Sequence, residues 1–99
     1  MATFVMLTRL SPEATTDPRA FEQLGQQVSE KLKTQCPDVK WIASYAVLGP
    51  YDYVDIFEAP DIEAATKVSV IIRSFGHATT ETWAATPWER FRELVRTIS

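Results

Sequence analysis

Asp55 is the residue of this sequence best suited to acid–base chemistry. It lies between Val54 and Ile56 in an apolar segment, although aspartate is depleted in strands. Tyr53 and Phe57 share its face, because side chains alternate along a strand. Partial burial among aromatic rings raises the pKa of a carboxyl group, which suits a proton-transferring base. We therefore take Asp55 as a candidate catalytic base and ligand contact.

Two alternatives remain open for Asp55: a salt bridge across a dimer, to Arg9 or Arg73, or a hydrogen bond to Thr8. His77 is the only histidine, and its ordinary pKa near neutrality makes it the second candidate acid or base. The alternative for His77 is a structural, hydrogen-bonded side chain at the start of a strand. One histidine excludes a multi-histidine metal site within one chain, and a site with one histidine and Asp or Glu ligands stays open as an alternative. No segment has metal-ligand spacing, so we expect no metal.

The other reactive residue types favour structural roles. Asp52 follows a Gly-Pro turn, where an aspartate side chain commonly accepts hydrogen bonds from backbone N–H groups. Cys36 is the single cysteine and is expected to be a packed thiol. The tryptophans are expected to be core or interface anchors, namely Trp41, Trp83 and Trp88. No nucleophile elbow or phosphate loop is present, so we expect no tightly bound cofactor.

Composition narrows the class of protein. Ninety-nine residues are expected to form one domain, residues 1–99, because a second core would need more chain. Hydrophobic residues make up 45% and charged residues 23%, which excludes a disordered chain. The net charge is −3 and the basic residues are scattered, so no nucleic-acid partner is expected. No apolar run approaches the ~20 residues that span a bilayer, and the start lacks the features of a signal peptide. With a single cysteine, these features predict a cytoplasmic protein without a membrane partner.

The spacing of apolar and turn residues predicts four strands and three helices. Strands are expected at residues 4–10, 39–48, 53–58 and 77–85. Helices are expected to begin at Asp17-Pro18, at Asp61 and at Thr86-Pro87-Trp88-Glu89, and Gly76 is expected to end the second. The order β-α-β-β-α-β plus a C-terminal helix predicts the α+β ferredoxin-like fold. Both crossover helices then cover one face of an antiparallel sheet and leave the other face bare.

The alternation of residues in the strands predicts which side chains lie on the bare face. Val54 and Ile56 are expected under the helices with Val5 and Leu7, which leaves Phe4, Met6, Thr8, Tyr53, Asp55 and Phe57 on the bare face. A hairpin loop with an even number of residues pairs Leu48 with Tyr53. It then places Ser44, Ala46 and Leu48 beside Asp55, and Trp41 and Tyr45 under the helices. A loop with an odd number of residues would reverse this.

Such a bare face is too apolar to remain in water and too polar to be core. Both conditions are met if the sheets of two copies face each other and enclose a cavity. The sequence therefore predicts a homodimer, or a higher homo-oligomer, with a small-molecule cavity. The expected ligand contacts are Thr8, Ser44, Tyr53, Asp55 and Phe57, and the candidate catalytic residues are Asp55 and His77.

The turn Gly49-Pro50-Tyr51-Asp52, followed by a strand and Glu58-Ala59-Pro60-Asp61, resembles the GYD-domain family. The resemblance runs from Thr3 to about Ala85. The resemblance implies that the chain is one of the small microbial proteins of this family, which is allied with the dimeric α/β-barrel superfamily. That superfamily includes cofactor-independent monooxygenases, isomerases, haem-handling proteins and ligand-sensing modules. The resemblance supplies no catalytic residues, because the family has no settled activity.

Two classes of function remain. We favour a small-molecule-binding domain, because the sequence does not define a pair of catalytic groups. The alternative is a cofactor-independent enzyme that performs proton transfer or monooxygenation on a small aromatic or enolisable substrate. Asp55 would then be the base, with Tyr53 and His77 as hydrogen-bond donors. Either class requires a cavity, and catalysis requires one of roughly 300 Å³ or more.

Overall fold

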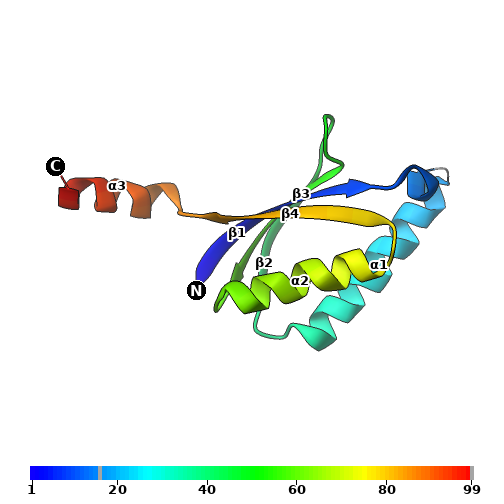
Figure 1. The fold of residues 1–99 in the computed structure, drawn as a ribbon, viewed down its shortest axis with the longest axis horizontal. Helices are drawn as coiled ribbons and strands as arrows, with labels where there is room; N and C mark the ends of the chain where they lie inside the picture. Colours follow the sequence, from blue (N-terminus) through cyan, green and yellow to red (C-terminus); the bar gives the residue numbers. More distant parts are fainter. Residues whose placement is uncertain (16, 99) are drawn as a thin grey trace.

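The computed structural model describes residues 1–15 and 17–98 of the chain. The elements are β1 (Ala2–Leu10), η1 (Pro12–Thr15), α1 (Pro18–Gln35), β2 (Lys40–Ala46), β3 (Tyr53–Ala59), α2 (Ile62–Ser74), β4 (Ala78–Ala85) and α3 (Trp88–Ile98). The strands form one antiparallel sheet in the order β2-β3-β1-β4. Figure 1 shows α1 and α2 on the same face of this sheet. The predicted α+β ferredoxin-like arrangement with an additional C-terminal helix is confirmed.

Both crossover helices begin where the sequence predicts, and the second also ends where it predicts. Asp17 Oδ1 accepts a hydrogen bond from the Arg19 amide at 3.0 Å, and Asp61 Oδ1 accepts one from the Ala64 amide at 2.8 Å. Both carboxylates thus satisfy amide groups that the first helical turn leaves without a partner. Gly76 follows α2 with a φ of 79°, a left-handed conformation that glycine adopts at little cost.

The sheet faces are the reverse of the sequence prediction. The face that packs on the helices carries Phe4, Met6, Thr8, Leu10, Tyr53, Asp55, Phe57 and Ala59. Val5, Leu7, Val54 and Ile56 lie on the other face, here called the open face. The prediction was wrong because both alternating sets are apolar, so the apolar pair Val54 and Ile56 does not identify the covered face. The large side chains fill the space under the helices instead, and Met6 and Phe57 are fully buried.

The β2–β3 hairpin has the predicted parity but a different pairing. Ala46 pairs with Tyr53 and Ser44 with Asp55, so an even number of residues separates the strands, as predicted. The expected pair of Leu48 with Tyr53 is wrong, because the Val47 amide already donates to Asp52 O at 2.9 Å. Leu48 therefore lies beyond the paired strands and is exposed.

The hairpin differs from the prediction in a second detail, because β2 has a β-bulge between Trp41 and Ala43. The extra residue shifts the alternation, so that Trp41 and Ser44 both lie on the helix-covered face. The Trp41 ring stacks on Phe57 at a centroid distance of 5.2 Å. Trp41 is under the helices as predicted, whereas Tyr45 is on the open face and 58% exposed.

The open face is itself apolar. Val5, Leu7, Val54 and Ile56 are half-buried there, and Trp83 of β4 is exposed beside them. The C-terminal helix α3 continues from the end of β4 and extends away from the sheet (Figure 1). Among residues 1–15 and 17–98, no helix is long and apolar enough to cross a membrane.

Candidate functional site

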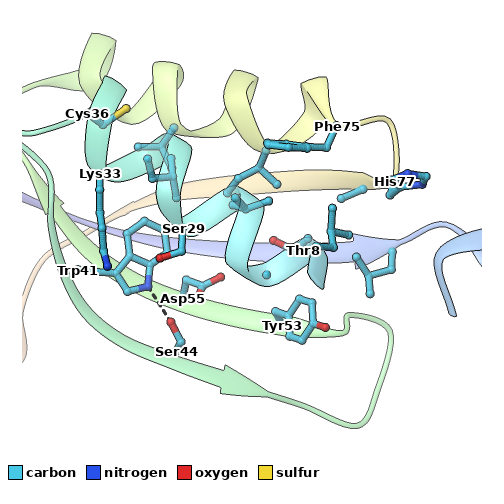
Figure 2. Close-up of a pocket in the computed structure, with 18 of the residues that line it drawn as sticks. Thr8, Ser29, Lys33, Cys36, Trp41, Ser44, Tyr53, Asp55, Phe75 and His77 are labelled. Carbon is cyan, nitrogen blue, oxygen red and sulfur yellow. Dashed lines mark hydrogen bonds between the residues drawn. The ribbon is translucent and has the colours of Figure 1, made fainter. Parts of the chain in front are cut away.

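A cavity of about 450 Å³ separates α1 from the sheet (Figure 2). Its helical wall is made by the apolar stripe of α1 and by part of α2, namely Phe21, Leu24, Val28, Leu32, Val68, Ile72 and Phe75. Its sheet wall is made by Thr8, Leu10, Trp41, Ser44, Tyr53 and Asp55. The α1 stripe is only half-buried, because it faces this space instead of packing directly on the strands.

Asp55 lies at the centre of the sheet wall. Its neighbours across the strands are Met6 of β1 and Ser44 of β2, and Figure 2 shows its carboxylate beside Ser44 and Trp41. Removal from water raises the pKa of the Asp55 carboxyl above its ordinary value, and hydrogen bonding from Ser44 and Trp41 offsets this only in part. The Asp55 carboxylate therefore binds a proton at a higher pH than an exposed aspartate does.

The bulge in β2 builds the surroundings of this carboxylate. Because it places Trp41 and Ser44 on one face, Trp41 Nε1 donates a hydrogen bond to Ser44 Oγ at 2.7 Å (Figure 2). The Trp41 ring is held by its stack on Phe57. The indole N–H of Trp41 and the hydroxyl group of Ser44 therefore lie together beside the Asp55 carboxylate.

The remaining polar groups lie toward the ends of the cavity. Figure 2 shows Lys33 beside Trp41 and His77 at the opposite end, beyond Tyr53. Burial raises the pKa of the Tyr53 hydroxyl and of the Cys36 thiol. Both groups are therefore neutral and able to donate a hydrogen bond at physiological pH.

The structure brings five of the six predicted site residues to one cavity: Thr8, Ser44, Tyr53, Asp55 and His77. The cavity is on the helix-covered face, so the predicted location on the open face is wrong. Phe57 does not line it, because this ring is packed between Phe4 and Trp41. His77 and Asp55 stand at different positions along the cavity, so they do not form a catalytic pair by direct contact.

Within the described part of the chain, Asp55 has neither an ion pair nor a hydrogen bond to Thr8, and the salt bridge across a dimer stays a prediction. Arg9 Nε donates to Pro50 O at 2.7 Å, on the open face, and Arg73 is exposed on α2. Among residues 1–15 and 17–98, no three His, Cys, Asp or Glu side chains are grouped so that they could hold a metal ion. The site is a mostly apolar cavity with one carboxylate in its wall.

Sequence reasoning missed the contribution of α1, Lys33 and Trp41 to the site. The α1 stripe has the spacing of an ordinary core-facing helix. It lines a cavity because α1 lies at a distance from the sheet, and the sequence does not show that distance. Trp41 was assigned to the opposite face from Ser44, because nothing in the segment from Trp41 to Ala43 marks the bulge.

The Gly49-Pro50-Tyr51-Asp52 turn is structural. Asp52 Oδ2 accepts a hydrogen bond from the Leu10 amide at 2.7 Å, and the Asp52 amide donates to Thr8 O at 2.8 Å. The Tyr51 hydroxyl donates to Glu81, which raises the pKa of Tyr51 and lowers that of Glu81. The turn is thereby fastened to β1 and β4, and it fixes the end of β3 that carries the site.

Comparison with known proteins identifies relatives of this chain. Residues 4–95 match the GYD domain family. A protein of Thermus thermophilus named glutamine synthetase and cystathionine beta-lyase binding protein is 30% identical over 91 residues, which cover 88% of this chain and 90% of the relative. The crystal structure of TTHA0845, also from Thermus thermophilus, is 27% identical with a TM-score of 0.62, over 88% of this chain and 95% of that one. At3g17210 from Arabidopsis thaliana, with 13% identity and a TM-score of 0.61 over 88% of this chain and 95% of that one, shares the fold.

Proposed function

This chain belongs to the GYD domain family, and we propose that it binds a small molecule in the cavity between α1 and the sheet. The observation that carries the proposal is the pairing of an apolar cavity of about 450 Å³ with one partly desolvated carboxylate, Asp55. Small-molecule sites have volumes of roughly 300–1,000 Å³ and combine an apolar lining with a few polar groups. A desolvated carboxylate contributes little to stability, so its presence in this wall favours a role in ligand contact.

The residues that line the cavity indicate which kind of ligand would fit. The α1 stripe and Phe75 offer apolar contact, whereas Asp55 and Ser44 offer hydrogen bonds from one side (Figure 2). A compact, mostly apolar molecule with one hydroxyl or amino group would satisfy both. The hydrogen bond to that group would replace the water that Asp55 loses on burial.

Ligand screening by thermal shift tests this proposal, with two matched variants. Val28→Phe fills the cavity from α1, whereas Val70→Phe makes the same change at an exposed position of α2 that does not line it. Compounds that raise the Tm of the unmodified protein should leave the Tm of Val28→Phe unchanged and should still raise the Tm of Val70→Phe. Equal responses of both variants would place binding elsewhere.

A second candidate function is cofactor-independent catalysis, proton transfer or monooxygenation, with Asp55 as the base. The raised pKa of Asp55 favours it, since a base is most effective when its pKa is near the working pH. Tyr53, on the same face, would donate a hydrogen bond to the developing oxyanion. Asp55→Asn distinguishes the two functions: turnover of a bound substrate would fall at least ~100-fold with binding retained if Asp55 is the base.

The open face supports a homodimer. Val5, Leu7, Val54 and Ile56, with Tyr45 and Trp83 exposed beside them, form an apolar sheet surface larger than isolated hydrophobic residues would give. Stacking of two such sheets would bury it and leave both cavities outside the interface. Sedimentation equilibrium should then give twice 11.2 kDa at micromolar concentration, and a species of 11.2 kDa would exclude this dimer.

The relative from Thermus thermophilus is named for binding glutamine synthetase and cystathionine beta-lyase. At 30% identity over 88% of the chain, enzymes of these two kinds are candidate partners for this protein as well. Pull-down of the two enzymes from the protein's own organism, with and without a cavity ligand, would test whether such binding occurs and whether it responds to the ligand.

A further inference from the structure

Helix α3 is amphipathic, and its apolar side is uncovered in the described chain. Trp88, Phe91, Val95 and Ile98 recur at spacings of three, four and three residues, which places them on one side of the helix. Trp88 is 68% and Ile98 84% exposed, and Leu94 beside them is also exposed. Figure 1 shows α3 extending away from the sheet and from both other helices. An isolated helix of eleven residues is marginal in water, so α3 requires a surface on which to pack.

Most charges on the polar side of α3 are paired within the helix. Arg90 pairs with Glu93 at 2.9 Å and Arg92 with Glu89 at 3.4 Å, both within the helix. These charges are therefore already balanced along the helix. The surface that covers α3 must match its apolar side.

The chain itself carries a surface of that kind, an apolar groove of about 360 Å³ between α2 and β4. Its apolar lining is Phe4 of β1, Ile62 and Ala65 of α2 and Ala84 of β4, and its polar lining is Thr66, Ser69 and Thr82. Ile62 is 73% exposed, and the buried Thr82 Oγ1 has no hydrogen-bond partner in the described part of the chain. Ala84 lies at the end of β4 that leads into α3, so the groove is next to the N-terminus of α3.

The connection between β4 and α3 keeps the helix out of its own groove. It consists of Thr86 and Pro87. Proline disfavours the helical conformation in the residue before it, and it fixes its own φ. The connection therefore holds the chain extended, in line with β4 (Figure 1). The groove of a second copy is open to α3 in this conformation.

We infer that α3 docks in the α2–β4 groove of a second copy of the chain, whose α3 docks in return in the groove of the first. Such reciprocal exchange is a low-cost route to a closed dimer. The five apolar side chains of one α3 expose roughly 500 Å², taking about 150–250 Å² for a whole aromatic side chain. The two helices alone then bury roughly 1,000 Å², and the smaller contribution of the two grooves brings the total close to the ~1,200 Å² at the lower end of stable interfaces. This inference is independent of what the cavity binds.

Disulfide trapping tests the exchange directly. In a Cys36→Ala background, the single variants Phe91→Cys and Thr66→Cys are mixed, refolded together and oxidised. The exchange predicts a covalent heterodimer of these two chains at least ~10-fold more abundant than one formed by Phe91→Cys with Glu22→Cys, an exposed position on α1. Equal yields from the two mixtures would overturn the inference.

The double variant Phe91→Cys/Thr66→Cys in one chain separates exchange from folding back. A covalent dimer of twice 11.2 kDa is the expected product. An internally linked chain of single mass would mean that α3 occupies its own groove and would overturn the inference. Phe91→Asp should in addition weaken self-association at least ~10-fold, whereas Glu89→Ala on the polar side should leave it unchanged.

Discussion

Trp41 connects the fold to the site, and its removal tests the β-bulge and the helix-covered face together. Trp41 is 37% exposed, so about 63% (1 − 0.37) of its surface is covered by the Phe57 ring and the cavity wall. With about 150–250 Å² for an aromatic side chain, roughly 150 Å² is removed from water, which is worth ~4 kcal/mol at about 25 cal/mol per Å². Alanine keeps the Cβ atom, and the unfolded chain already covers part of the ring. We therefore expect Trp41→Ala to lower the free energy of unfolding by about 2–4 kcal/mol.

Urea unfolding followed by circular dichroism measures this loss without depending on the tryptophan signal. Trp41→Phe is the matched variant, since it keeps the stack on Phe57 but removes the N–H donor near Asp55. It should cost about 1 kcal/mol. It should also raise the pKa of Asp55 further, because hydrogen bonding from Trp41 lowers that pKa. A Trp41→Ala variant within ~1 kcal/mol of the unmodified protein would place the ring at the surface and refute the reasoning.

Three further predictions concern single residues. The raised pKa of Asp55 means that the folded protein keeps a proton that the unfolded chain has lost above the ordinary value of 3.8. Stability should therefore fall as the pH rises through the window between 3.8 and the raised native pKa. Asp55→Asn should remove this fall and be equally or more stable at neutral pH, as urea melts from acidic to mildly alkaline pH would show. Asp52→Ala should cost ~1–3 kcal/mol in urea melts, because the Leu10 amide loses its acceptor; an unchanged midpoint would mean that water replaces the carboxylate. Gly76→Ala should cost ~1–2 kcal/mol through its φ of 79° alone, since open space surrounds a Cβ there. Gly25→Ala, equally unhindered but inside α1, should gain up to ~1 kcal/mol; the same sign for both glycines in a thermal melt would contradict this explanation.

The sequence predicts the order of elements because each boundary has a local chemical cause. Asp17 and Asp61 bond to the amides of their own first turns, and Gly76 adopts the conformation that ends α2. Such contacts lie within a few residues of each other, so composition and spacing are sufficient to find them.

The faces of the sheet could not be predicted in the same way. Both alternating sets in β1 and β3 are apolar, so the choice depends on which set packs better against α2, and single residues do not determine that. Thr8 and Asp55 line a cavity on the buried side, so their polarity does not identify the open face. The grouping of Asp55 with Ser44 and Tyr53 was still predicted, because it depends on the parity of the hairpin and not on which face is covered.

A crystal structure of the protein purified from its own organism tests the central claim most directly. If the cavity is a small-molecule site, electron density for a compact, mostly apolar ligand should lie between the α1 stripe and Asp55. One polar atom of that ligand should be within hydrogen-bond distance, about 2.6–3.2 Å, of the carboxylate. A structure in which α1 has closed onto the sheet, so that Val28 and Leu24 pack on Tyr53 and no space remains beside Asp55, would contradict the claim.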